Sequence, residues 1–149
     1  MVLPIRGEYH YSRNCPYCKT FDNFVLSVLE IRGYLRIKRY CLDLLHDHPA
    51  IYRNYKFARA FGLPYLTPLL ILEDPKRGNV GFAVIIPKEK YEKIQMEADK
   101  KKVLDVLLEE VRPMARDLMI YLYQLGEEYN FSIEGVLKDP FISKAVKIE

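Results

Sequence analysis

Two cysteines separated by two residues, Cys15 and Cys18, constrain this chain more than any other feature. They follow an alternating run at 8–12, which predicts a strand, and they precede an amphipathic pattern at 17–32, which predicts a helix. Cys15 is therefore expected at a helix N-terminus, where unpaired N–H groups and the helix dipole favour an anion such as a thiolate. A Cys-x-x-Cys pair in this place supports thiol–disulfide exchange.

Residues 15–18, Cys-Pro-Tyr-Cys, resemble the dithiol of glutaredoxins, and the wider pattern is similar to the thioredoxin superfamily. A second landmark of that superfamily is a cis proline that faces the dithiol and opens a buried strand. Pro68, which precedes an apolar run at 69–73, matches this landmark, and a cis bond is favourable only before proline. The resemblance covers roughly residues 5–110.

The resemblance implies a role for each of these residues. Cys15 is the exposed nucleophile and Cys18 is the resolving thiol. Backbone groups of the residue before the cis proline are implied to pair with the substrate chain. The residues expected to contact the substrate are Pro16, Tyr17, Thr67 and Pro68.

The predicted order of elements is strand, helix, strand, helix, strand, strand, helix. It predicts an α/β, thioredoxin-like fold, in which a four-stranded mixed sheet is flanked by helices and followed by a helical C-terminal extension. We divide the chain into a thioredoxin-like domain, 1–112, and an extension, 113–149, packed on the same domain. Strands are predicted at 8–12, 34–42, 69–73 and 81–86, and helices at 17–32, 50–61 and 88–111.

The extension begins where Pro113 is expected to break or restart the long helix. A further apolar stripe, from Met114 to Leu125, predicts a helix that ends at Gly126. The pair Asp139-Pro140 is a helix start, and the last short helix is expected to run to Ile148.

Two departures from the family pattern bear on mechanism. Thioredoxins keep a buried carboxylate six residues before the first cysteine, and here that position is Tyr9. The proton of Cys18 is therefore expected to go to water, to Lys19 or to a substitute group. The glutathione-binding signature of glutaredoxins is also poorly matched at 79–82, so protein disulfides are the expected substrates, with glutathione as a candidate reductant and no other cofactor.

Composition limits the remaining functional classes. The net charge of +3 is too small to predict a nucleic-acid partner, and no apolar run approaches the ~18 residues of a membrane-spanning helix. The run Lys100–Lys102 is interpreted as a solvated helix face. The N-terminus shows no secretory signal, so a cytoplasmic protein is expected, and the abundance of Lys, Glu, Ile and Tyr leans towards a thermophile.

Alternatives to redox chemistry stay open at this point. In the first alternative, the cysteine pair supplies two of the four ligands of a zinc site. His10, Cys41, His46 and His48 are the candidates for the other two ligands. In the second alternative, the thioredoxin-like fold serves as a binding module that forms a homodimer through its C-terminal helices. Under the redox interpretation the partners are disulfide-bearing client proteins and a reductase, and Cys41 packs as a small apolar residue.

Overall fold

The computed structural model describes residues 2–147 and contains one four-stranded sheet with the order β2-β1-β3-β4. β1 and β2 are parallel, and β3 is antiparallel to both β1 and β4. The fold is therefore α/β with a mixed sheet, as predicted. The strands are β1 (Ile5–Tyr11), β2 (Leu35–Cys41), β3 (Leu69–Asp74) and β4 (Gly78–Ala83).

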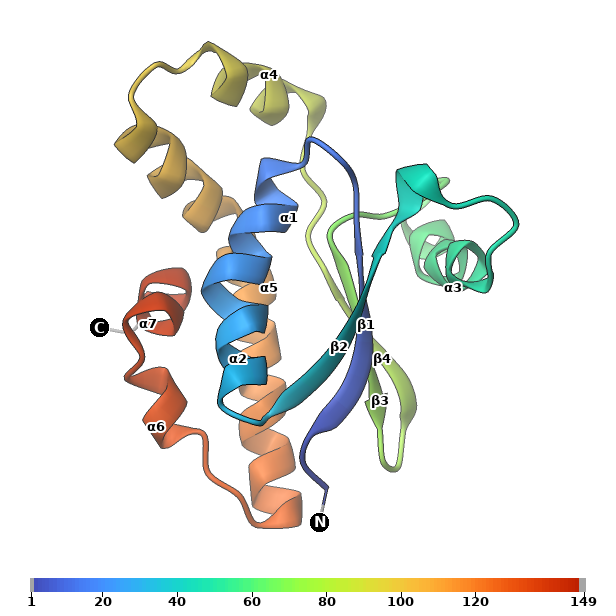
Figure 1. Ribbon diagram of the computed structural model, residues 1–149, viewed down its shortest axis with the longest axis vertical. Coiled ribbons are helices and arrows are strands. Elements are labelled where there is room, and N and C mark those ends of the chain that lie inside the picture. The colour runs from blue at the N-terminus through green and yellow to red at the C-terminus, as the bar shows by residue number, and fades with distance from the viewer. Residues whose placement is uncertain (1, 148–149) are drawn as a thin grey trace.

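Helices cover both faces of this sheet. Figure 1 shows α1, α2 and α5 on one face and α3 on the other, with α4 near the start of α1. A short π-helical segment, Asp22–Leu26, joins α1 to α2, so that one helical rod connects the two parallel strands. The helices are α1 (Pro16–Phe21), α2 (Ser27–Ile31), α3 (Pro49–Ala58), α4 (Lys88–Met96), α5 (Lys100–Tyr129), α6 (Glu134–Leu137) and α7 (Pro140–Val146).

β3 is buried on both faces, which explains its uninterrupted apolar sequence. Leu70 and Leu72 face the larger core, which α1, α2 and α5 complete. Leu69 and Ile71 face a smaller core under α3. The central position of β3 brings the end that follows Pro68 beside the end of β1, where the cysteine pair begins.

Two strand boundaries differ from the prediction. β1 begins at Ile5 rather than at residue 8, and β4 covers 78–83 rather than 81–86. The second difference follows from a tight turn, because Asp74 Oδ1 accepts the backbone N–H groups of Lys76 and Arg77, both at 2.8 Å. Gly78 then opens β4 with a φ of 80°, a conformation that favours glycine.

The helices after residue 88 begin and end at other residues than predicted. The helix expected at 88–111 is two helices, because Asp99 caps a new one by accepting the N–H of Lys101 at 3.0 Å. The expected break at Pro113 is also wrong, since α5 continues through it to Tyr129. The apolar face of α5 is buried on both sides of the proline, and this burial outweighs the one backbone hydrogen bond that proline removes.

The prediction that this helix ends at Gly126 is also wrong. α5 ends one turn later, at Tyr129, and its C-cap residue Asn130 adopts the left-handed conformation with a φ of 62°. Gly126 instead leaves room for the next segment, because an added Cβ there would collide with the carbonyl oxygen of Phe131. The last helix begins at Pro140 as predicted, and its expected end at Ile148 lies outside the described residues.

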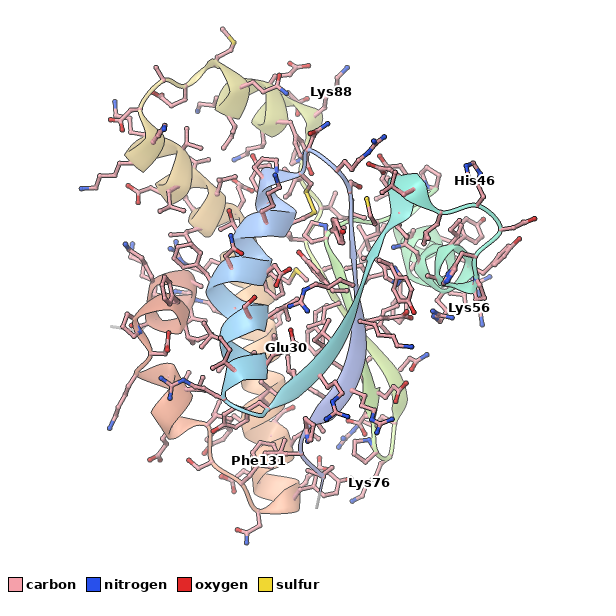
Figure 2. All side chains as sticks on the ribbon, in the orientation of Figure 1. Glu30, His46, Lys56, Lys76, Lys88 and Phe131 are labelled. Carbon is pink, nitrogen blue, oxygen red and sulfur yellow. A yellow bond between two sulfur atoms is a disulfide. The ribbon has the colours of Figure 1, made fainter. Side chains whose placement is uncertain are left out.

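The C-terminal helices pack on the same core as the sheet. Met114, Leu118 and Val146 belong to the core cluster that contains Tyr9 of β1. Arg116 Nε also donates to the carbonyl of Val146 at 2.8 Å, which ties α5 to α7. In Figure 2, side chains fill the space between the sheet and its helices, and labelled lysines such as Lys56 and Lys76 lie at the periphery. None of the helices in residues 2–147 is long and apolar enough to cross a membrane.

The buried Asp74 predicts a specific loss of stability in acid. Burial by itself raises the pKa of Asp74, but the Tyr121 hydroxyl at 2.6 Å, the N–H groups of Lys76 and Arg77 and the Arg77 guanidinium together lower this pKa to about 2. The pKa of an unfolded aspartate is about 3.9. The carboxylate therefore stabilises the fold above about pH 4, and this contribution is lost as the pH falls towards 2.

We expect Asp74→Asn to remove this pH dependence. Urea unfolding at several pH values should show that the free energy of unfolding of the wild type falls about 2 kcal/mol more than that of the variant between pH 4 and pH 2. Asp105→Asn, on the outer part of α5, serves as the matched control, because its side chain is exposed. Parallel pH profiles for wild type and Asp74→Asn would contradict the assignment.

Candidate functional site

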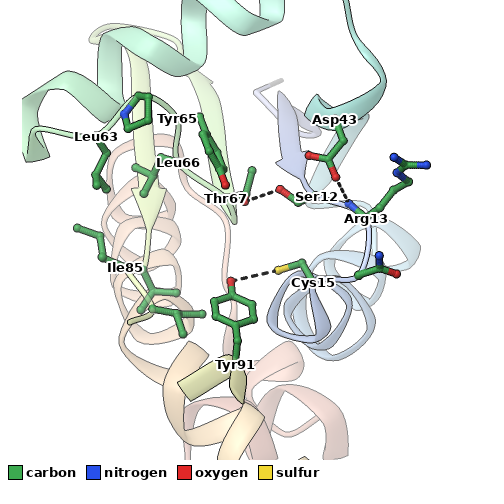
Figure 3. A pocket seen from close by; sticks show the side chains of 14 residues that line it. Ser12, Arg13, Cys15, Asp43, Leu63, Tyr65, Leu66, Thr67, Ile85 and Tyr91 are labelled. Atoms are coloured by element: carbon green, nitrogen blue, oxygen red, sulfur yellow. Dashed lines mark hydrogen bonds between the residues drawn. The ribbon is translucent and has the colours of Figure 1, made fainter. Parts of the chain in front are cut away.

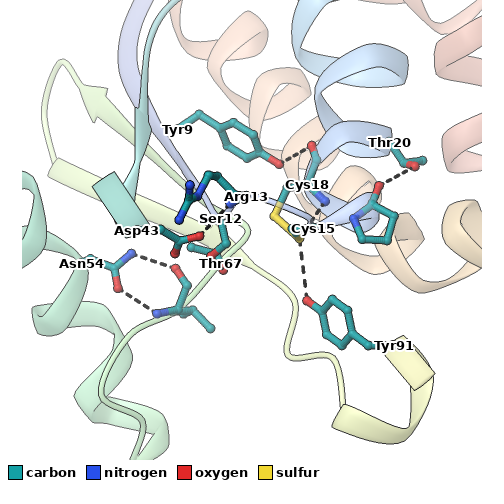
Figure 4. The surroundings of a disulfide bond; sticks show 12 residues. Tyr9, Ser12, Arg13, Cys15, Cys18, Thr20, Asp43, Asn54, Thr67 and Tyr91 are labelled. Atoms are coloured by element: carbon teal, nitrogen blue, oxygen red, sulfur yellow. Dashed lines mark hydrogen bonds between the residues drawn. A yellow bond between two sulfur atoms is a disulfide. The ribbon is translucent and has the colours of Figure 1, made fainter. Parts of the chain in front are cut away.

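Cys15 and Cys18 form a disulfide at the start of α1 (Figure 4), with their Cα atoms 5.3 Å apart. Cys15 is the N-cap residue of this helix, and Pro16 occupies the first helical position, as predicted. The backbone N–H of Cys18 donates to Cys15 Sγ at 3.2 Å. A backbone N–H that has no partner within the helix is thus directed at the sulfur that would carry negative charge in the reduced protein.

The disulfide is more enclosed than the family resemblance implies. Cys15 is 3% exposed and Cys18 is 1% exposed, so the expectation of an exposed nucleophile is not met in this state. Tyr91 of α4 accounts for part of this enclosure, because its hydroxyl oxygen lies 3.7 Å from Cys15 Sγ. Its ring packs edge-on against Tyr17, with the ring centroids 4.9 Å apart.

A cavity of about 440 Å³ borders the disulfide on the side of Cys15. Tyr65 and Tyr91 approach it from opposite sides, and Ile85 lies between them on one wall (Figure 3). On the opposite wall, the hydroxyls of Ser12 and Thr67 lie 2.8 Å apart and join the end of β1 to the loop before β3. Substrate atoms in this cavity would contact Cys15 before they reached Cys18.

The Thr67–Pro68 peptide is cis, as predicted, and a buried asparagine holds the loop in front of it. Asn54 of α3 is 1% exposed. Its side-chain amide donates to the carbonyl of Leu66 at 2.7 Å and accepts the Leu66 N–H at 2.8 Å. This pair of hydrogen bonds satisfies both backbone groups of the residue that precedes Thr67, and so sets the position of the loop relative to the disulfide.

Asn54 also contacts His10, a buried side chain of β1 that lies beside Glu8. Asn54 Nδ2 lies 2.9 Å from His10 Nδ1, so that nitrogen accepts and the proton of the neutral ring is on Nε2, facing Glu8. Burial lowers the pKa of His10, which keeps the ring neutral. Burial raises the pKa of Glu8, but the hydrogen bonds from Arg53 and the charge of Arg53 lower it overall. These groups lie behind the loop and outside the cavity.

Tyr9 occupies the position of the family's buried carboxylate but serves a different purpose. Its hydroxyl donates to the carbonyl oxygen of Cys18 at 2.7 Å, and burial raises its pKa well above the ordinary value. A tyrosine that remains protonated does not accept the proton of Cys18. A second cavity of about 350 Å³ borders Cys18, Lys19 and Asp22 on the other side of the disulfide. Asp22 is paired there with Arg39 at 2.8 Å.

The structure brings only some of the predicted substrate-contacting residues to the cavity. Thr67 lines it, whereas Tyr17 is wholly buried and its hydroxyl has no hydrogen-bond partner among the described residues. Pro16 is half-buried at the start of α1, and Pro68 is buried at the start of β3.

The candidate zinc ligands do not gather around the disulfide. Cys41 is a free, buried thiol at the end of β2, as predicted. His10 Nδ1 accepts from Asn54, and His48 Nδ1 caps α3 by accepting the N–H of Ala50 at 3.0 Å. Within residues 2–147 there is no group of three or more His, Cys, Asp or Glu side chains with the geometry of a metal site.

Sequence reasoning missed three residues of the site: Ser12, Asn54 and Tyr91. Asn54 had a detectable signal, because it is a polar residue on the same helical face as Ile51 and Ala58. Tyr91 had none, since its contact with Cys15 spans 76 residues and depends on where α4 lies.

Comparison with known proteins adds little to this geometry. No family model matches the chain, and no curated protein matches it. A solved structure described as a malarial protein is similar over 62% of this chain and 98% of its own length, with 15% sequence identity and a TM-score of 0.35. A similarity this low assigns the chain to no family.

Proposed function

We propose that this protein is a thiol–disulfide oxidoreductase of the thioredoxin type that reduces or exchanges disulfides of client proteins. The observation that carries the proposal is the Cys15–Cys18 disulfide, which borders a cavity at the start of a helix. A donor from the backbone of Cys18 is already directed at Cys15 Sγ. The Thr67–Pro68 loop faces the same cavity, which is the arrangement that the sequence resemblance leads us to expect.

The proposed reaction starts from the reduced protein. The Cys15 thiolate attacks one sulfur of a substrate disulfide, forms a mixed disulfide and expels one substrate thiolate. The Cys18 thiolate then attacks Cys15 Sγ, so that the second substrate thiolate leaves and the Cys15–Cys18 disulfide forms. Two electrons pass from the dithiol to the substrate, and solvent supplies the protons that the substrate thiolates take up. A reductase or glutathione returns the two electrons.

The loop before Pro68 supports a polypeptide substrate. Thr67 lies beside the cavity but outside β3, which begins two residues later at Leu69, so its backbone groups are not part of the strand ladder. An extended substrate segment beside Thr67 would place its cysteine near Cys15, because both residues line one cavity. We place this activity in the cytoplasm, where a buried thiol such as Cys41 stays reduced.

A homodimeric binding module is the second candidate, and one observation favours it. A largely apolar cavity of about 470 Å³ lies on the C-terminal helices, beside the exposed side chains of Ile120 and Tyr123. A second copy of the chain that covered this face would bury both side chains. This candidate predicts an inert cysteine pair, whereas the oxidoreductase predicts a pair that interconverts between dithiol and disulfide in thiol buffers. A redox titration of the two cysteines therefore tests the proposed function.

A further inference from the structure

Tyr91 of α4 contacts Cys15 Sγ, the sulfur that attacks the substrate in the proposed reaction. Its hydroxyl oxygen lies 3.7 Å from Cys15 Sγ, within the range of a hydrogen bond to sulfur. A disulfide sulfur carries no hydrogen, so the tyrosine O–H is the donor. Figure 4 shows this contact on the side of Cys15 Sγ that faces α4.

Two contacts hold Tyr91 in place, one made by its own ring and one made by the neighbouring residue of α4. Its ring packs edge-on against the wholly buried ring of Tyr17, with an interplanar angle of 79°. The next residue toward the N-terminus, Lys90, forms an ion pair with Glu110 of α5 at 2.5 Å. Burial also raises the pKa of Tyr91, so its hydroxyl keeps its proton and remains a donor at neutral pH.

We propose that Tyr91 is a further catalytic residue, whose hydroxyl donates a hydrogen bond to the Cys15 thiolate of the reduced protein. This inference rests on the proposed function, since it assigns a partner to the nucleophile of that reaction. The same bond stabilises Cys15 as the attacking thiolate when a substrate is reduced and as the leaving thiolate when a substrate is oxidised. Tyr91 keeps its proton in both directions, so the balance of protons and electrons is unchanged.

Tyr91→Phe removes the hydroxyl and keeps the ring that covers the sulfur. A hydrogen bond to a charged group is worth enough to move the midpoint of thiolate formation by about one pH unit. We therefore expect the pH profile of Cys15 alkylation by iodoacetamide to move about one pH unit higher in the variant. The rates are measured on the reduced protein and assigned to Cys15 by peptide mass.

The two profiles should cross. Below both midpoints the variant has about tenfold less thiolate, but each thiolate is about threefold more nucleophilic, so it reacts about threefold more slowly. Above both midpoints it reacts about threefold faster, because only the difference in nucleophilicity remains. Superimposable profiles would overturn the inference, and so would a uniform change at every pH, because that would report altered access alone.

Tyr121→Phe is the matched control. It also deletes one tyrosine hydroxyl and one hydrogen bond, the bond to Asp74, which lies at the end of β3 opposite to the end beside the cysteines. Its alkylation profile should coincide with that of the wild type, and a displaced profile would count against the inference. If the wild type forms a reversible disulfide but its profile matches that of Tyr91→Phe, only the role of Tyr91 fails. If the wild type forms no reversible disulfide, the proposed function fails, while crossing profiles would still support the hydrogen bond.

Discussion

Replacing Cys15 by serine is expected to reduce protein-disulfide cleavage, the activity proposed here, to the background rate of the buffer reductant. A serine hydroxyl is not ionised at neutral pH and does not form a mixed disulfide, so the first step of the proposed reaction has no nucleophile. The measurement is the reduction of insulin by catalytic amounts of protein in the presence of a small thiol. Cys15 lines the cavity of about 440 Å³ and Cys18 does not, so a client in this cavity would reach Cys15 first.

Two further cysteine variants make the test specific. Cys18→Ser should still attack a substrate but fail to release it, so mixed disulfides at Cys15 should accumulate and be visible by mass. Cys41→Ser is the matched control and should keep the activity of the wild type, because Cys41 is a buried thiol outside the site. Activity retained by Cys15→Ser, or lost by Cys41→Ser, would contradict the assignment of the nucleophile.

Replacing Asn54 by leucine should both destabilise the protein and impair its activity. Leucine is similar in size but leaves the N–H and the carbonyl of Leu66 and the Nδ1 of His10 without their partner. Each buried polar group left unpaired costs about 1–3 kcal/mol, so the three groups together cost about 3 kcal/mol or more. We expect the free energy of unfolding to fall by about 3 kcal/mol and the Tm to fall by about 10 °C. Activity should fall further than stability accounts for, because the loop that carries Thr67 loses its anchor.

Asn23→Leu is the matched control for this variant. Asn23 lies in the helical rod, and its side chain is exposed, so the same substitution should change the free energy of unfolding by no more than about 0.5 kcal/mol. Urea unfolding of the three proteins gives the difference, and the insulin assay is run at a temperature where all of them are folded. An Asn54→Leu variant as stable and as active as Asn23→Leu would show that the loop is positioned by other contacts.

Much of the fold was predictable because local patterns and tertiary packing agree. The apolar run after Pro68 predicted a buried strand, which the structure shows to be covered on both faces. The glycines at 33 and 62 follow helices and have the positive φ values that end them. The prediction failed where long-range packing overrides a local rule. Pro113 lies inside α5 because the face of that helix is buried before and after it, and this burial is not visible in a window around the proline.

Only those residues of the site that belong to a recognisable sequence motif were predictable. Cys15 and Cys18 were found from their spacing, and Pro68 from its place before an apolar strand. Tyr91 and Asn54 reach the site from α4 and α3, and their partners are distant in sequence. A rule based on spacing therefore does not identify them. The enclosure of Cys15 was missed for the same reason, since it depends on the position of α4.

The most direct test of the proposed oxidoreductase activity is a redox titration of Cys15 and Cys18. The metal-free protein is equilibrated in graded thiol–disulfide buffers, free thiols are trapped by alkylation, and the modified cysteines are counted by peptide mass, with the buried Cys41 as an internal reference. The account predicts one reversible two-electron transition between about −120 and −300 mV, confined to Cys15 and Cys18. A pair that forms no disulfide in any of these buffers, together with one zinc ion per chain in the untreated protein, would contradict it.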